Sequence, residues 1–218
     1  MWNIALRVIL GIGVLMAILF GCAGRWNLPF VWAYLAVLVG ATIATIPVID
    51  PGLLRERAKP GPGGVDRNLR FIAVPFFLGH LVVAALDAGR FQWSGTIPAG
   101  VQAAGLAGLA ASLAVSIRAV SVNRFFSPVV RIQSERGHHL VTTGPYRWVR
   151  HPGYAAALAS MVCSGPALGS WWSMLPLVPM FILLLRRTVI EERYLHEHLE
   201  GYRSYAKTVR YRLIPGIW

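Results

Sequence analysis

Two clusters of polar side chains stand out near the carboxyl end of this apolar sequence. The first lies between His138 and Tyr154 and holds three histidines, two arginines, two tyrosines and a tryptophan. Gly144-Pro145 is a turn signal, and Pro152 suits the first turn of a following helix. We therefore expect irregular backbone here that presents amide groups, cations and flat rings to a ligand.

The second cluster is Arg186-Arg187, followed by Glu191-Glu192 and His196. On a helix, Arg187 and Glu191 are four residues apart and share a face, as do Glu192 and His196. Such a face could complete a binding site with the first cluster. The spacing alone fits equally well with a solvated helix end whose charged side chains pair with one another.

Long apolar stretches must position both clusters. The chain has 218 residues, of which 56% are hydrophobic and 14% charged, an apolar balance beyond that of a soluble domain. A membrane crossing needs about 20 apolar residues in a helix. Four stretches have that length: Ile4–Cys22, Leu28–Ile49, Phe71–Ala88 and Ala99–Val120. We expect one all-α integral membrane domain, with a first helix that is retained and not cleaved as a signal peptide.

A fifth apolar region, Tyr154–Leu185, is too long for one plain crossing. It contains Ser164-Gly165-Pro166 and Gly169-Ser170, which break helices, so we expect a C-terminal re-entrant helical hairpin. Basic residues concentrate in 50–70, in 118–150 and after the hairpin. The positive-inside rule places all three on the cytoplasmic side. The net charge of +12 is thus explained by membrane orientation and anionic lipid, and nucleic-acid binding is not expected.

Several polar residues have simpler expected roles. His80 should pack between helices, Asp87 should reach the membrane interface from its helix end, and His138 should face solvent. The composition of Lys59–Gly64 is typical of a flexible turn and not of a packed element. Three aromatic residues should anchor an amphipathic tail: Tyr202, Tyr205 and Trp218.

In this order, the polar motifs resemble the isoprenylcysteine carboxyl methyltransferase family, including its bacterial homologues, and the related phospholipid methyltransferases. The matching residues are His139-Leu140-Val141, Gly144-Pro145-Tyr146, Arg150-His151-Pro152 with Tyr154, Glu191-Glu192, Gly201-Tyr202, Tyr205 and Arg212-Leu213-Ile214-Pro215. The resemblance covers about residue 138 to the end of the chain. The segment Asp50–Asp66 also looks like the bacterial members.

The resemblance implies an S-adenosylmethionine-dependent methyltransferase with a cytoplasmic cofactor pocket and a lipophilic acceptor that enters from the bilayer. Residues 1–120 would be transmembrane helices, 121–218 the catalytic module, and the location a bacterial inner membrane. The implied cofactor-binding residues are His139, Leu140, Val141, Gly144, Pro145, Tyr146, Arg150, His151, Pro152, Tyr154 and Glu192. The implied catalytic residues are Arg187, Glu191 and Glu192.

The chemistry of this cofactor suits the residue types. Glu191 or Glu192 could pair with its ammonium or a ribose hydroxyl, and Arg150 could hold its carboxylate as a bidentate partner. Hydrogen bonds or stacking to the nucleoside are offered by His139, His151 and Tyr146. A carboxylate acceptor needs no general base, whereas an amine would need one. A lipid amine, a thiol or a lipophilic acid remains open as acceptor.

Three other protein classes compete with this reading. A metal enzyme is disfavoured because no His-Glu-x-x-His motif occurs and Arg150 adjoins His151. An NADPH-dependent sterol-type reductase resembles the Arg-His-Pro block, but Glu191-Glu192 would repel a 2′-phosphate. In a non-enzymatic membrane protein such as a small transporter, polar residues inside the membrane should line a path for the substrate. The first four apolar stretches hold few polar residues, which disfavours this class.

Overall fold

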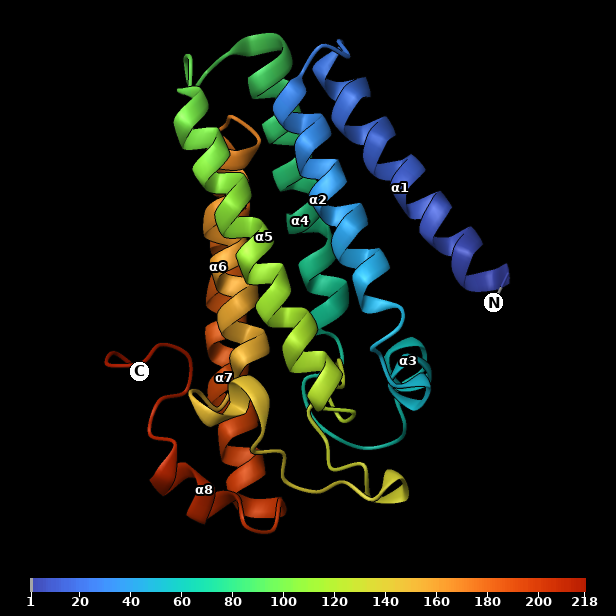
Figure 1. Cartoon of the computed structure of the whole chain (residues 1–218), viewed down its shortest axis with the longest axis vertical. Coiled ribbons are helices and arrows are strands. Elements are labelled where there is room, and N and C mark those ends of the chain that lie inside the picture. Colours follow the sequence, from blue (N-terminus) through green and yellow to red (C-terminus); the bar gives the residue numbers. More distant parts are fainter. Residues whose placement is uncertain (1) are drawn as a thin grey trace.

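The structure is a computed structural model that describes residues 2–218, apart from the side chains of residues 2–5 and Arg70. The regular elements in this range are helices. One isolated antiparallel β-bridge joins Val65 to Val130. The helices are α1 (Trp2–Ala23), α2 (Pro29–Thr45), α3 (Pro51–Ala58), α4 (Leu69–Leu86), α5 (Ala99–Val122), α6 (Pro152–Ala167), α7 (Leu177–His198) and α8 (Tyr202–Thr208). Six of them form a bundle, and α3 and α8 lie at its lower end (Figure 1).

Four segments in the described chain are long and apolar enough to cross a membrane. They are Leu6–Ala23, Phe71–Phe91, Ala99–Val122 and Trp172–His198. The expected second crossing is shorter than predicted, because α2 ends at Thr45. Pro47 follows two residues later and has no backbone N–H with which to continue the helical hydrogen bonds. α2 remains an apolar helix inside the bundle.

The fifth apolar region forms two helices, of which α6 packs along α5 and α7 packs on α4 and α6 (Figure 1). The predicted break at Ser164-Gly165-Pro166 is wrong, since α6 continues to Ala167 and the chain turns at Gly169, where φ is +75°. A Cβ on Gly105 would lie 2.6 Å from the Ala167 nitrogen, so glycine lets α5 and α6 approach closely. The hairpin thus reaches the N-terminal part of α5.

A buried hydrogen-bond chain ties the middle of the bundle together. His80 is fully buried, with Nδ1 2.8 Å from the Ser173 carbonyl oxygen and Nε2 2.7 Å from Ser164 Oγ. A carbonyl only accepts, so Nδ1 carries the proton and Nε2 of the neutral ring accepts from Ser164. Tyr34 then donates to Ser164 across 2.8 Å. His80 has the helix-packing position expected from the sequence.

Asp87 lies at the end of α4 and packs inside the protein. Its side chain is fully buried and accepts hydrogen bonds from the Ser94 backbone nitrogen at 2.8 Å and from Ser170 Oγ at 2.6 Å. Because these partners come from two separate turns, the carboxylate joins the loop after α4 to the turn between α6 and α7. A buried carboxylate that is satisfied by hydrogen bonds has a structural role here.

Candidate active site

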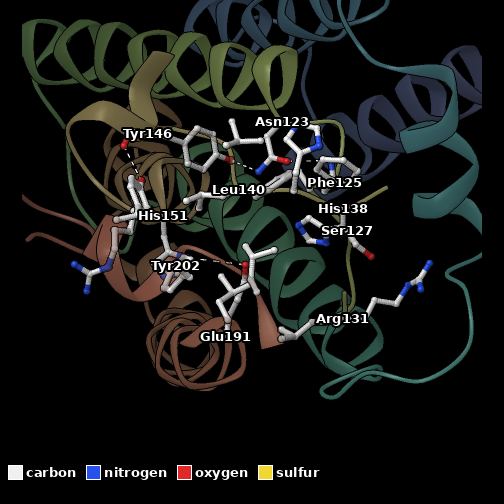
Figure 2. A pocket seen from close by; sticks show the side chains of 18 of the residues that line it. Asn123, Phe125, Ser127, Arg131, His138, Leu140, Tyr146, His151, Glu191 and Tyr202 are labelled. Carbon is white, nitrogen blue, oxygen red and sulfur yellow. Dashed lines mark hydrogen bonds and ion pairs between the residues drawn. The ribbon is translucent and has the colours of Figure 1, made fainter. Parts of the chain in front are cut away.

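A pocket lies at the lower end of the bundle, where the loop after α5 meets α6, α7 and α8 (Figure 2). The loop contributes Asn123, Phe125, Phe126, Ser127, Val129, Val130, Arg131, His138, His139, Leu140, Val141, Tyr146, Arg150 and His151. The helices contribute Tyr154, Glu191, Leu195, Leu199, Tyr202 and Tyr205. The two polar clusters of the sequence therefore meet in one site.

Residues 139–141 line this pocket with backbone nitrogens that have no backbone partner among the residues described. None of their backbone nitrogens donates a backbone hydrogen bond within the described chain. Leu140 and Val141 are half-buried pocket residues. Half-buried backbone donors without partners are ready to bind a polar ligand, since leaving them unpaired costs free energy.

Gly144 and Pro145 do not line the pocket but place Tyr146 in it. They begin a 3₁₀ turn, Gly144–Arg147, in which Gly144 has φ +60°. The Tyr146 hydroxyl accepts a hydrogen bond from Asn123 Nδ2 at 2.9 Å, and its carbonyl accepts from the Tyr205 hydroxyl at 2.6 Å. The buried Tyr146 ring is thereby held between the end of α5 and α8. Pro152 is buried and begins α6.

His138 belongs to the pocket, and the expectation that it faces solvent is wrong. Its ring stacks on Phe125 with centroids 4.4 Å apart, and its Nδ1 accepts from the Gln133 backbone nitrogen at 3.2 Å. Burial and neighbouring cationic side chains lower the pKa of His138 to about 4. The ring is therefore neutral near pH 7, and Nε2 carries the proton.

Glu192 is buried behind the pocket and does not line it. Its carboxylate lies 2.8 Å from Arg150 Nη2, 2.8 Å from His151 Nε2 and 3.3 Å from the Tyr202 hydroxyl. Arg150 also donates from Nη1 to the carbonyl of Val209 at 2.6 Å. Arg150 and Glu192 thus form a buried ion pair, but Arg150 still lines the pocket, and its buried Nε has no hydrogen-bond partner in the described chain. Only Glu192 is withdrawn from the pocket wall, where the sequence placed both residues.

Glu191 is the acidic side chain that lines the pocket. It accepts a hydrogen bond from the Tyr154 hydroxyl, which in turn accepts from Arg187 Nε at 2.8 Å. Arg187 is 4% exposed, and its Nη1 lies 3.3 Å from Asp66 Oδ2. His151 stacks on Tyr154 with the ring planes 4° apart. A chain of polar groups therefore leads from the linker before α4 to the pocket.

The linker after α3 is a packed element, and the prediction of a flexible turn is wrong. Val65 and Val130 exchange backbone hydrogen bonds of 2.9 and 3.3 Å. Gly64 has φ +79°, and a Cβ there would lie 2.6 Å from the Val130 carbonyl oxygen. Only glycine fits this close approach without strain. The glycines that predicted a flexible turn instead allow the linker to lie close to the backbone of Val130.

A buried ion pair holds the linker in place. Glu56 accepts from Arg131 Nε and Nη2, both at 2.9 Å, from Ser127 Oγ at 2.8 Å and from the Gly61 nitrogen at 3.2 Å. The hydrogen bonds from the Arg131 guanidinium hold the pKa of Glu56 at about 2. This bidentate pair joins α3 to the loop that lines the pocket.

Residues 106–197 match the model of the isoprenylcysteine carboxyl methyltransferase (ICMT) family. Over this range the chain is similar to the ICMT family. No curated protein matches the chain. The ICMT match and the four long apolar segments support a membrane methyltransferase of this family. The matched range contains both polar clusters, whereas the packed linker, α8 and the C-terminal residues lie outside it.

Sequence reasoning missed part of the pocket wall. Asn123, Phe125 and Phe126 follow directly after the apolar stretch that became α5, and this position at a helix end beside the first cluster was the available signal. The pairs Arg131–Glu56 and Arg187–Asp66 gave no local signal, because the two members of each pair lie 75 and 121 residues apart in the sequence.

Proposed function

We propose that this protein is an S-adenosylmethionine-dependent methyltransferase that modifies a lipophilic acceptor at the cytoplasmic face of a membrane. The observation that carries the proposal is the pocket itself. It combines aromatic walls, unpaired backbone donors and a single lining carboxylate, Glu191, directly below an apolar bundle. Both arms of the α6–α7 hairpin would cross the membrane, since α6 runs along α5 to its N-terminal part and α7 packs on α6 and α4.

The residues of the pocket fit this cofactor. Adenine needs flat surfaces and hydrogen-bonding partners, which Tyr146, His138 and the backbone of residues 139–141 provide. The cationic amino-acid end needs an acid, and Glu191 is in the pocket. Glu192 would act indirectly, by fixing Arg150 and His151, which both line the pocket.

The cofactor supplies a methyl group that is already activated on a positively charged sulfur. The protein therefore has to align the acceptor and exclude water, and positioning accounts for much of the rate. Arg187 is buried and held by Tyr154 and Asp66 on the membrane side of Glu191. A carboxylate acceptor would pair with this guanidinium. An amine or thiol acceptor would release a proton, for which Glu191 is the nearby base.

Calorimetric titration of the purified protein with S-adenosylhomocysteine, with NADPH as control ligand, tests the cofactor. We expect S-adenosylhomocysteine to bind and Glu191→Gln to weaken it by about tenfold, the worth of one charge-assisted hydrogen bond. Glu197→Gln is the matched control, because Glu197 lies on the same helix with a side chain that is 67% exposed. Absence of binding, or binding of NADPH alone, would refute the proposal.

Methyl transfer is then measured with cofactor labelled in the methyl group and a membrane lipid extract. Labelled methanol released by base would identify a methyl ester and hence a carboxylate acceptor. Base-stable label would identify a nitrogen or sulfur acceptor. No lipid-soluble label in any extract would contradict a lipophilic acceptor.

A further inference from the structure

The C-terminal tail, residues 209–218, is built into the back of the pocket. The backbone nitrogens of Arg150 and His151 donate to the carbonyls of Tyr211 and Arg212 at 3.0 and 2.9 Å. These are the residues that hold Glu192. Movement of the tail would therefore disturb the hydrogen bonds behind the candidate active site.

The tail also packs with residues of α6 and α7. Leu213 is 4% exposed and packs in one apolar cluster with Trp218, Leu158 of α6 and Phe181 of α7. In Figure 1 the C-terminus lies beside the lower parts of α6 and α7, above α8. Ile217, in contrast, is 78% exposed. An exposed isoleucine beside apolar membrane helices indicates contact with lipid.

A basic concavity lies next to the tail. Its basic side chains are Arg150, His196, Arg203, Lys207, Arg210 and Arg212. Glu192 is the acid in it, and that charge is already paired with Arg150 and His151. Arg203, Lys207 and Arg210 are exposed. The concavity therefore has a net positive charge, carried by exposed side chains.

We propose that the basic concavity and the C-terminal tail together form a docking surface for an acidic phospholipid. The isoleucines of the tail contact the acyl chains, and the arginines and lysine bind the phosphate. Charge complementarity identifies the headgroup as anionic, since a zwitterionic headgroup would not compensate the excess charge. The tail places the concavity at the membrane boundary, which identifies the source as lipid and not as a dissolved anion.

Lipid retention tests the headgroup. The full-length protein is reconstituted in nanodiscs of equal phosphatidylglycerol and phosphatidylcholine, released into detergent, and examined by native mass spectrometry. We expect phosphatidylglycerol to be retained in excess. The variant Arg203→Gln/Lys207→Gln/Arg210→Gln should reduce this excess by about tenfold or more, since each basic residue near an anionic surface contributes to binding.

The variant Arg55→Gln/Lys59→Gln/Arg147→Gln is the matched control, because it removes three exposed charges outside the concavity. It should keep the excess of phosphatidylglycerol. Equal retention of both lipids by the wild type, or an equal loss in the control, would overturn the proposal. Displacement of the lipid by millimolar inorganic phosphate would also overturn it, because it would identify a site for a free anion.

The depth of the tail gives an independent test. A spin label at Ile217→Cys, with Cys22→Ala and Cys163→Ala, should be more accessible to oxygen than to a water-soluble nickel complex. A label at Glu200→Cys, an exposed position in the turn before α8, should show the reverse. A label at 217 that behaves like the label at 200 would refute membrane contact. Neither readout uses the cofactor or methyl transfer, so failure here is distinct from failure of the proposed function.

Discussion

Loss of the Glu56 carboxylate should destabilise the protein far more than loss of a surface acid. The side chains of Glu56 and Arg131 are 5% and 4% exposed, and Arg131 has one other acidic partner, Glu135, whose side chain is 56% exposed. Breaking a buried ion pair leaves a charge without compensation and costs about 3–5 kcal/mol. Because Glu135 remains, we expect Glu56→Ala to cost about 3 kcal/mol.

The assay is thermal unfolding of the purified protein in detergent. A loss of about 3 kcal/mol corresponds to a melting temperature lower by about 6–12 °C for a chain of this length. Glu135→Ala is the control, because it removes an exposed partner of the same arginine and should cost about 0.5 kcal/mol. The double variant Glu56→Met/Arg131→Met should recover much of the loss, since no buried charge remains.

The pH dependence follows from the low pKa of Glu56. This pKa is about 2 in the folded protein, below the ordinary value of 4.5. The Glu56 carboxylate therefore makes its full contribution to stability above about pH 4.5, and this contribution is lost as the pH falls toward 2. The difference between wild type and Glu56→Ala should stay constant from pH 6 to 8. A change in melting temperature below about 2 °C, or a double variant as unstable as Glu56→Ala, would refute the reasoning.

Three further predictions concern the pocket. Asp66→Asn should lower kcat by about tenfold and leave the Kd for S-adenosylhomocysteine unchanged, since Asp66 contacts Arg187 and not the pocket; a changed Kd would contradict this. Gly64→Ala should cost about 2 kcal/mol in thermal unfolding, because φ is +79° and the Cβ would meet the Val130 carbonyl; an unchanged melting temperature would exclude the close approach. The pKa of His138 is about 4, below the ordinary 6.5, so its contribution to stability is complete above pH 6.5 and is lost between pH 6.5 and 4. The melting temperature of His138→Gln should therefore fall less than that of wild type over this range, and equal slopes would refute a buried neutral imidazole.

Local patterns in the sequence were sufficient for the membrane helices and for the location of the site. Hydropathy and helix length depend on neighbouring residues, so the stretches that became α1, α4 and α5 were predicted to within about three residues. The turn signal Gly144-Pro145 and the helix start at Pro152 were also correct, because both act on their own backbone. The family resemblance was based on about residue 138 to the end of the chain, and the ICMT model matches residues 106–197, so the two overlap over 138–197.

The tertiary structure decided which charged groups face the pocket and which face one another. Glu191 and Glu192 are adjacent in sequence, yet the first lines the pocket and the second is buried against Arg150. Consecutive side chains on a helix point about 100° apart. Which of the two glutamates faces the pocket therefore depends on the distant segments that pack against each side of α7. The packed linker at Gly64 was unpredictable for the same reason, since a glycine-rich segment becomes ordered only when another backbone, here that of Val130, lies close enough to pair with it.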